Sequence, residues 1–374
     1  MKRAHLRILV PILVLVLAAV VLFLQQLQKT EPVYFRTAAF GELSENLEGD
    51  PFTVYRWDGG NSCTPVFATE EDVWPEAGAI SGDNLYYTVV TEENDSEVYR
   101  IYRADLKTGK RELLADLDCR VWELEVCGKD LFLAVYDPEA GYRLGVLRSG
   151  EFLDCAPLSG ISRQMISCDD SGCWYRSSGS AETGLSLCYL PADTLVPETV
   201  YENIPLPIEL QAAPEGVYLS CQFREDIDAG AFSLVFCPRD GSGAVKLLTD
   251  LTPDGPEVSE KKRVRFQGFM ALWEDKLFYV TATDYWPNPE GEDRGEYLHC
   301  LDRKTGKVTD YGRIDPDTDV GTVQFSYLLT CGKQGFILTE SDWWAMDKET
   351  ANRYSLYTWD GRRTELRPAD SAAK

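Results

Sequence analysis

"IYRADLKTGK" at residues 101–110 is repeated almost unchanged as "LHCLDRKTGK" at residues 298–307. In both copies an alternating strand leads into a polar turn, and the turn leads into another short strand. Gly109 and Gly306 occupy the place where a bulged hairpin turn needs a left-handed backbone conformation. The two copies therefore predict one hairpin that the fold uses at two equivalent positions.

A strand–turn–strand pattern of this kind occurs repeatedly along the chain. Its turns carry Gly, Asp, Asn or Pro, which are the residues typical of hairpin turns. The seven segments with the pattern are 53–67, 101–117, 144–155, 187–201, 234–251, 298–314 and 356–366.

A second kind of hairpin precedes most of these segments. In it a polar turn is followed by a large apolar strand, as in 81–90, 127–136, 169–178, 213–223, 273–283 and 331–341. Two hairpins in a unit of roughly 45 residues give four strands per unit, which is typical of a β-propeller blade.

The repeats predict an all-β protein with a single β-propeller domain at residues 33–368 and a short tail at 369–374. Seven four-stranded blades are expected, with residues 33–39 supplying a strand to an irregular first blade. The alternative is six blades, in which residues 33–67 only complete the ring. No amphipathic helix pattern of useful length occurs outside the N-terminus.

A family resemblance rests on "NLYYTVV" (84–90) together with the repeated hairpin at 101–114. These segments resemble the YWTD propellers of low-density-lipoprotein-receptor proteins and the related membrane-anchored or periplasmic bacterial propellers of the Tol-protein-B kind. Residues 86–89 and 278–281 stand in place of Tyr-Trp-Thr-Asp and lack the aspartate of that motif. The resemblance covers most of 79–368, and it implies binding and scaffolding rather than a particular reaction.

The N-terminus predicts a membrane anchor. Residues 1–7 are basic, and residues 8–24 form an uninterrupted apolar run with the length of a short membrane span. No small-residue cleavage site follows in the linker at 25–32, so we expect an uncleaved signal anchor, with a cleaved signal peptide as the alternative. The positive-inside rule places residues 1–7 in the cytoplasm and the propeller outside it.

Charge excludes one class of partner. The chain carries 61 acidic and 37 basic residues, a net charge of −24 at pH 7. A surface this negative repels nucleic acid, so no nucleic-acid partner is expected. It is compatible with cationic groups, metal ions and neutral sugars.

The eleven cysteines fit the repeat, although their odd number leaves at least one without an intramolecular partner. Cys188, Cys237 and Cys300 fall at or near one place in the third strand of their blades, which predicts small apolar residues packed between blades. Cys168 and Cys173 flank a "DDSG" turn and are a possible disulfide. Against that bond, cross-strand separations are often a little too wide.

Most catalytic and metal chemistry is not indicated. The only histidines are His5, in the predicted cytoplasmic tail, and His299, on a repeat strand, where a packed or surface role is expected. Zinc-type spacings are absent from the sequence, so neither a metal nor a cofactor is predicted. The enzymatic alternative that stays open is a set of Asp or Glu side chains in the central funnel, acting on glycans.

Three long connections between second and third strands suggest a contact face. They are 224–230, 283–295 and 340–352, in blades 5, 6 and 7. Aromatic residues beside acidic ones suit a sugar face, a cationic group or a protein hot spot, whereas the alternative is simple loop packing. The candidate binding residues are Asp284, Tyr285, Trp286, Asp293, Asp342, Trp343, Trp344 and Asp347.

These observations predict a membrane-anchored extracytoplasmic propeller that binds or scaffolds a protein or a glycan of the cell envelope. A glycan-acting carboxylate enzyme is one alternative. A sensory ectodomain is the other, and it would act through a membrane partner, because seven cytoplasmic residues are too few for a signalling domain.

Overall fold

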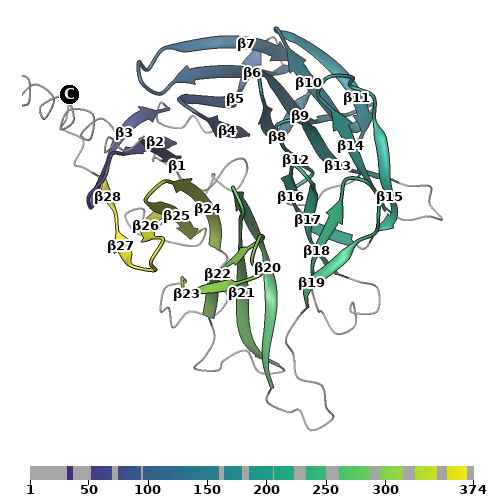
Figure 1. Ribbon diagram of the computed structural model, residues 1–374. Helices are drawn as coiled ribbons and strands as arrows, with labels where there is room; N and C mark the ends of the chain where they lie inside the picture. Colours follow the sequence, from purple (N-terminus) through teal and green to yellow (C-terminus); the bar gives the residue numbers. More distant parts are fainter. Residues whose placement is uncertain are drawn as a thin grey trace, which may run out of the picture.

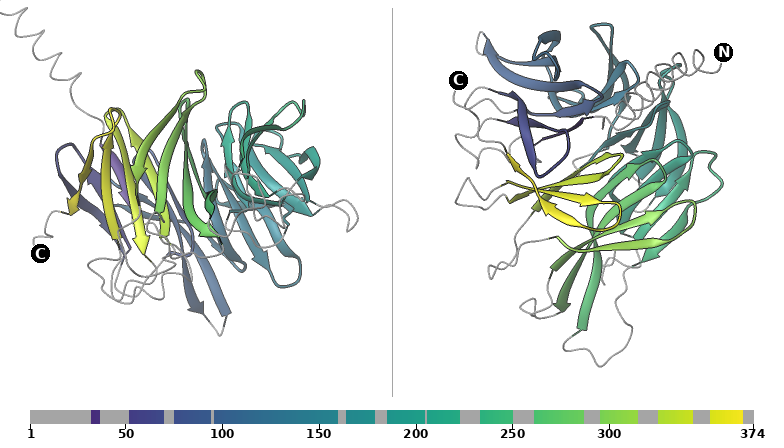
Figure 2. Two further views of the ribbon diagram at one scale, coloured as in Figure 1. Left: turned by 90° about the horizontal axis from the view of Figure 1, so that it is seen from below. Right: turned by 60° about the vertical axis from the view of Figure 1, so that its left-hand side comes forward.

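A computed structural model of the chain contains only β-strands, turns and short connections in its described part. The strands form seven four-stranded sheets arranged around a ring (Figures 1 and 2). This confirms the predicted all-β propeller with seven blades, and the six-blade alternative is wrong. The described residues are 32–36, 52–69, 75–93, 96–159, 164–178, 185–204, 206–222, 233–249, 261–286, 295–314, 325–342 and 352–368.

Blades 2 to 7 each consist of four consecutive antiparallel strands. Blade 2 contains β4 (Gly78–Ser81), β5 (Asn84–Glu93), β6 (Ser96–Asp105) and β7 (Arg111–Leu117). Blade 3 contains β8 (Arg120–Cys127), β9 (Asp130–Asp137), β10 (Gly141–Arg148) and β11 (Glu151–Pro157). Blade 4 contains β12 (Ile166–Cys168), β13 (Gly172–Ser178), β14 (Leu185–Pro191) and β15 (Glu198–Ile204).

The second half of the ring repeats the arrangement. Blade 5 contains β16 (Leu206–Ala213), β17 (Gly216–Gln222), β18 (Ser233–Pro238) and β19 (Val245–Thr249). Blade 6 contains β20 (Lys261–Trp273), β21 (Lys276–Trp286), β22 (Gly295–Asp302) and β23 (Val308–Arg313). Blade 7 contains β24 (Phe325–Gly332), β25 (Gly335–Asp342), β26 (Asn352–Thr358) and β27 (Arg363–Glu365).

Blade 1 combines both ends of the propeller. It contains β1 (Val33–Arg36), β2 (Thr53–Trp57), β3 (Ser62–Ala68) and the last strand of the chain, β28 (Arg367–Pro368). β28 follows β27 of blade 7 and pairs in parallel with the start of β3, which closes the ring (Figure 1). The strand predicted within 33–39 is thereby confirmed.

The second strand of each blade is apolar because it is buried on both faces. In β9, Leu133 and Val135 pack in the core shared with blade 2, whereas Phe132 and Ala134 pack in the core shared with blade 4. Successive side chains of a strand point to opposite faces, so one strand serves two inter-blade cores. This explains the continuous apolar runs that the sequence places after each first turn.

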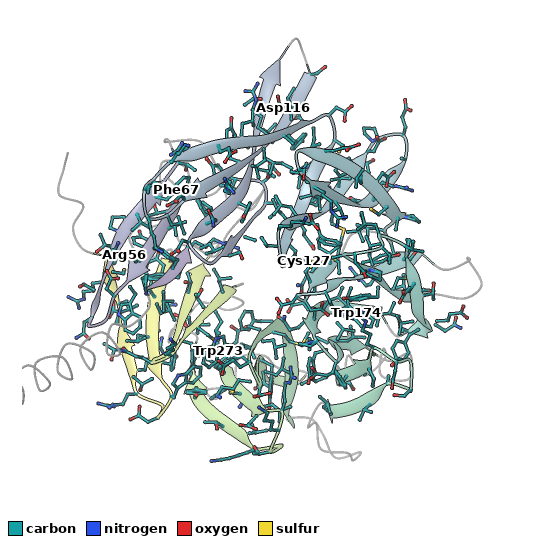
Figure 3. The ribbon with its side chains drawn as sticks, turned by 45° about the horizontal axis from the view of Figure 1, so that its top comes forward. Arg56, Phe67, Asp116, Cys127, Trp174 and Trp273 are labelled. Carbon is teal, nitrogen blue, oxygen red and sulfur yellow. The ribbon has the colours of Figure 1, made fainter. Side chains whose placement is uncertain are left out.

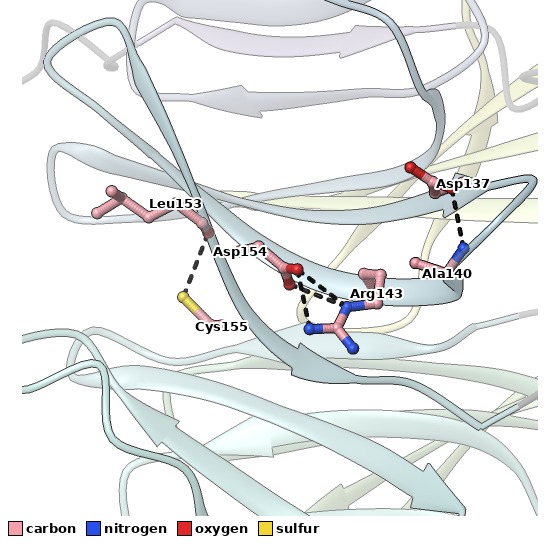
Figure 4. A network of polar contacts seen from close by, with 6 residues as sticks. All are labelled: Asp137, Ala140, Arg143, Leu153, Asp154 and Cys155. Carbon is pink, nitrogen blue, oxygen red and sulfur yellow. Dashed lines mark hydrogen bonds and ion pairs between the residues drawn. The ribbon is translucent and has the colours of Figure 1, made fainter.

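The outer strands are joined by polar contacts instead. In blade 3 the guanidinium of Arg143 forms a two-pronged ion pair with Asp154, with Nε–Oδ1 at 3.0 Å and Nη2–Oδ2 at 2.8 Å (Figure 4). The Asp137 carboxylate accepts a hydrogen bond from the amide of Ala140 and so fixes the turn that leads into β10. Because both ion-pair partners are partly exposed, their contribution to stability is modest.

The repeated decapeptide forms the same hairpin in blades 2 and 6. In blade 2 the Asp105 carboxylate accepts hydrogen bonds from the amides of Lys107 and Thr108, both at 2.9 Å. Lys107 also forms an ion pair with Asp83, in the turn between β4 and β5. Gly109 has a φ of 71°, as the turn requires.

Blade 6 reproduces each of these contacts. Asp302 accepts from the amide and hydroxyl of Thr305, Lys304 forms an ion pair with Asp275, and Gly306 also has a φ of 71°. A shift of register follows Ile101 in blade 2 and Leu298 in blade 6, so the two hairpins share the same bulge. The interpretation of the decapeptide as one reused hairpin is confirmed.

Replacement of Gly109 tests the turn. A Cβ at this position would meet no atom within 4 Å, so the cost of Gly109→Ala is backbone strain alone. We expect Ala to destabilise the chain by about 1 kcal/mol, and Asn to cost less because it tolerates the left-handed region. Denaturant unfolding of the two variants checks this, and an Ala variant as stable as the parent would contradict the assigned turn.

The predicted N-terminal segments are outside this description. Residues 1–7 and the predicted anchor at 8–24 belong to the part of the chain that is not described, as does the tail at 369–374. Among the residues that are described, no helix is long and apolar enough to cross a membrane.

Candidate functional site

The connections of the propeller divide between two faces. The turns inside each hairpin, including the two Lys-Thr-Gly turns, lie on one face. The links between blades and the connections from second to third strands lie on the other, as the strand order of four-stranded blades requires. The predicted contact residues belong to this second face, which we call the connection face.

The structure describes the backbone of only part of the predicted contact set. Asp284, Tyr285 and Trp286 are the last three residues of β21, and Asp342 is the last residue of β25. The other predicted contact residues, Asp293, Trp343, Trp344 and Asp347, lie outside the described residues.

The end of β21 is paired with a basic run. The register places Lys261 opposite Trp286, Lys262 opposite Tyr285 and Arg263 opposite Asp284. The basic run "KKRVR" (261–265) therefore lies on the strand next to the end of β21.

This strand pair is longer than its counterparts. β20 has 13 residues and β21 has 11, whereas the corresponding strands of blade 3 have 8 each. In Figure 1 the two strands reach further than β22 and β23 of the same blade. The extra length ends on the connection face, next to the connection between β21 and β22.

A second polar region, which we call the inner polar region, lies along the innermost strands of blades 3 and 4. β8 lies against β12 of the next blade, and Cys127 at its end is on the inner side of the ring (Figure 3). The Glu123 carboxylate accepts hydrogen bonds from the amide of Met165 at 2.7 and 2.9 Å and from the amide of Ile166 at 3.0 Å. Glu123 thus satisfies amide groups at the edge of β12 that no further strand pairs with.

Hydrogen bonds of the same kind join blade 4 to blade 5. The side chain of Gln164 accepts a hydrogen bond from the amide of Leu210 at 3.2 Å, and the hydroxyl of Ser167 accepts one from the amide of Ala212 at 2.9 Å. Side chains of one blade therefore accept hydrogen bonds from backbone amides of the next blade, as a neighbouring strand would. Sequence reasoning missed this role, because an isolated Glu, Gln or Ser on a strand carries no pattern.

Burial perturbs the charged groups of this region. It raises the pKa of Glu123 to about 8, against the effect of the amides of Ile166 and Met165, which lower it. It also raises the pKa of the half-buried Glu125 to about 7, which the positive charge of Arg36 partly offsets. The pKa of Arg36 is itself lowered to about 9 by burial. A loss of solvation thus dominates at all three groups.

The two glutamates are not equivalent chemically. Glu123 is bound by backbone amides, whereas the side chain of Glu125 has no hydrogen bond to another described residue and is affected by the charge of Arg36. Hydrolysis of a glycoside by two carboxylates needs both of them free to face the substrate. In this structure the Glu123 carboxylate is held by amides of the next blade.

Other candidate centres are accounted for by packing. His299 lies on β22, where its Nε2 is 2.8 Å from the hydroxyl of Thr281 and its ring stacks on Tyr279. Burial lowers the pKa of His299. The side chain of His299 is thus packed within its blade, which is one of the two positions expected for it. Among the described residues no group of three or more His, Cys, Asp or Glu could hold a metal ion.

Comparison with known proteins concerns the fold. No protein-family model matches the chain, and no curated protein matches its sequence. Similar solved structures include a putative TolB from Agrobacterium tumefaciens, with 12% identity over 75% of this chain and 88% of that one, at a TM-score of 0.43.

Two further structures are similar over almost the whole chain. An oligogalacturonate lyase from Vibrio parahaemolyticus has 10% identity over 92% of this chain and 88% of that one, at a TM-score of 0.49. An uncharacterized protein from Listeria monocytogenes has 10% identity over 92% of this chain and 97% of that one, also at 0.49. The resemblance to TolB-type and YWTD propellers stays a prediction of the sequence.

Replacement of Glu125 by Gln tests the inner polar region. The pKa of Glu125 in the folded chain is about 7, whereas an ordinary glutamate loses its proton near pH 4.5, so the stability of the parent falls as the pH rises through this window. Glu125→Gln cannot ionise, so we expect it to gain on the order of 1 kcal/mol relative to the parent between pH 4.5 and pH 8. Thermal unfolding of the parent and the variant across this pH range shows which of the two is more stable.

The matched control is Glu198→Gln, at an exposed position on β15. This variant should not gain stability relative to the parent between pH 4.5 and pH 8 as Glu125→Gln does. A Glu125→Gln variant with the pH dependence of the parent would contradict the buried carboxyl.

Proposed function

We propose that this protein is a binding module that receives its partner on the connection face of blades 5 to 7. The observation that supports this most is the extended β20–β21 strand pair of blade 6. Its register sets Lys261 and Lys262 opposite Trp286 and Tyr285, at the end that borders the connections before β20 and after β21.

The residue types at this end favour a macromolecular partner. Trp, Tyr and Arg are the residues enriched at the energetic centres of protein interfaces, and aromatic rings also bind sugar faces and cationic groups. A basic run at 261–265 is uncommon in a chain with a net charge of −24, so it gives this place a local charge that differs from the rest. The partner we propose is a protein or a glycan of the cell envelope.

The proposed location follows from the sequence. Residues 8–24 would anchor the chain in the membrane, and the positive-inside rule would place the propeller on the extracytoplasmic side. A glycan-acting enzyme and a sensory ectodomain stay predictions of the sequence.

Site-specific photocrosslinking in cells of the native host tests this proposal. The full-length chain would carry p-benzoylphenylalanine in place of Trp286, and in a control in place of Leu113, which is 48% exposed on the outer strand β7. We expect a defined crosslinked product from position 286 that position 113 does not give. Equal crosslinking at the two positions, or none at 286, would contradict a contact face on blade 6.

The strength of this contact has its own test. Exchange of Tyr285 and Trp286 for Ala should weaken binding of the captured partner by tenfold or more, because truncation of a central aromatic side chain typically costs about 2 kcal/mol. The parent and the double variant would be compared by titration with that partner. Unchanged affinity would place the contact elsewhere on the connection face.

A further inference from the structure

Sulfur is concentrated at one inter-blade contact. The core between blades 3 and 4 contains five cysteines, namely Cys127, Cys155, Cys168, Cys173 and Cys188. All five are thiols in the structure. Two of them, Cys168 and Cys173, are directly opposite each other on the antiparallel strands β12 and β13.

The geometry of this pair suits a disulfide. The amide of Asp169 donates a hydrogen bond to the carbonyl of Gly172 at 3.0 Å, so that pair is hydrogen-bonded. Hydrogen-bonded and non-hydrogen-bonded pairs alternate along antiparallel strands, which makes Cys168–Cys173 a non-hydrogen-bonded pair with Cα atoms about 4.5 Å apart. Disulfides span Cα separations of about 4.4–6.8 Å. The separation of the Cα atoms, which is often too wide for a cross-strand disulfide, is smallest at such a pair.

The turn between the two cysteines holds them in register. Oδ1 of Asp169 accepts hydrogen bonds from the amides of Ser171 at 2.7 Å and Gly172 at 3.0 Å. The hydroxyl of Tyr189, on β14, donates to the same oxygen at 3.0 Å. The turn is therefore fixed both from within and from the neighbouring strand.

The two cysteines differ in exposure. The side chains of Cys168 and Cys173 interact with each other, and the thiol of Cys173 donates a hydrogen bond to the carbonyl of Trp174 at 3.5 Å. Cys173 is fully buried, whereas Cys168 is partly exposed, which makes Cys168 the more accessible residue of the two. Burial raises the pKa of both thiols, which disfavours the reactive thiolate.

Two other thiols of this core have different neighbours. The thiol of Cys155 donates to the carbonyl of Leu153 on its own strand (Figure 4). The sulfur of Cys188 lies 3.7 Å from the hydroxyl of Thr199. Neither is opposite another cysteine in the strand register, so they serve as internal comparisons.

We propose that Cys168 and Cys173 are an oxidation site, at which a cross-strand disulfide closes the first hairpin of blade 4. The oxidant is a disulfide, either of glutathione or of a thiol–disulfide oxidoreductase. The thiolate of Cys168 attacks the oxidant, forms a mixed disulfide and releases one thiol. The thiolate of Cys173 then attacks the sulfur of Cys168 and releases the second thiol. Two protein thiols become one disulfide, and the oxidant disulfide becomes two thiols.

The bond would act on the inner polar region. Cys168 ends β12, the strand whose first amide binds Glu123. A covalent link across the hairpin fixes this strand against β13. This inference is independent of the partner proposed for the connection face.

Mass spectrometry of the full-length chain tests the site. The folded protein is treated with glutathione disulfide, its remaining thiols are blocked with N-ethylmaleimide, and it is cleaved with an endoprotease that cuts before Asp169. We expect two peptides joined through Cys168 and Cys173, which separate on reduction. The link should be lost in Cys168→Ala and retained in Cys188→Ala, a control in the same core.

Two outcomes would overturn the proposal. One is complete blocking of both Cys168 and Cys173 by N-ethylmaleimide after treatment with glutathione disulfide and unfolding. The other is a predominant link from Cys168 to Cys127, which would join two blades instead of one hairpin.

Discussion

The ring depends on the contact between its two ends. A blade is a twisted sheet with two apolar faces, and it can bury both only between two neighbours. Blades 7 and 1 obtain this contact where Phe35 and Trp57 pack with Ile337, Tyr354 and Leu366. The parallel pairing of β28 with β3 continues the last strand of blade 7 onto the edge of blade 1. Without that contact, two apolar faces would be exposed to water.

Polar contacts also join neighbouring blades, on the face opposite the connection face. Arg239 of blade 5 donates to the hydroxyl of Ser171 in blade 4 and lies 3.8 Å above the ring of Tyr189. Arg303 of blade 6 forms an ion pair with Glu215 in blade 5 and lies 5.5 Å from the ring of Tyr218. In two blades an arginine after the third strand thus contacts the preceding blade, which adds polar and cation–π contacts to the packing between them.

The sequence predicted the parts of the fold that depend on local pattern. The turns at Gly109 and Gly306 were predictable because a left-handed residue between two alternating strands has few alternatives. The closing strand was not, since two residues such as Arg367 and Pro368 carry no periodicity. The amide-binding role of Glu123 depends on a strand of the next blade, and nothing local encodes such a neighbour.

The candidate binding site was also predictable only where it depends on local sequence pattern. The end of β21 at Trp286 was predicted as part of a long connection, and the structure shows it instead as a strand paired with Lys261. The sequence could not show this, because the pairing depends on how far β20 continues beyond the blade. The thiol pair was visible as a spacing, but only the register of Cys168 and Cys173 distinguishes a close pair from a wide one.

Hydrogen exchange of a Leu366→Ala variant tests ring closure most directly. Leu366 is 2% exposed in the closing core, so truncation should leave a cavity that costs about 2–5 kcal/mol. The account predicts faster exchange in β1–β3 and β24–β28, with β8–β15 unchanged, and no change in a Leu113→Ala control. Exchange that is unaltered at both ends of the ring, or that rises equally in every blade, would contradict closure through this contact.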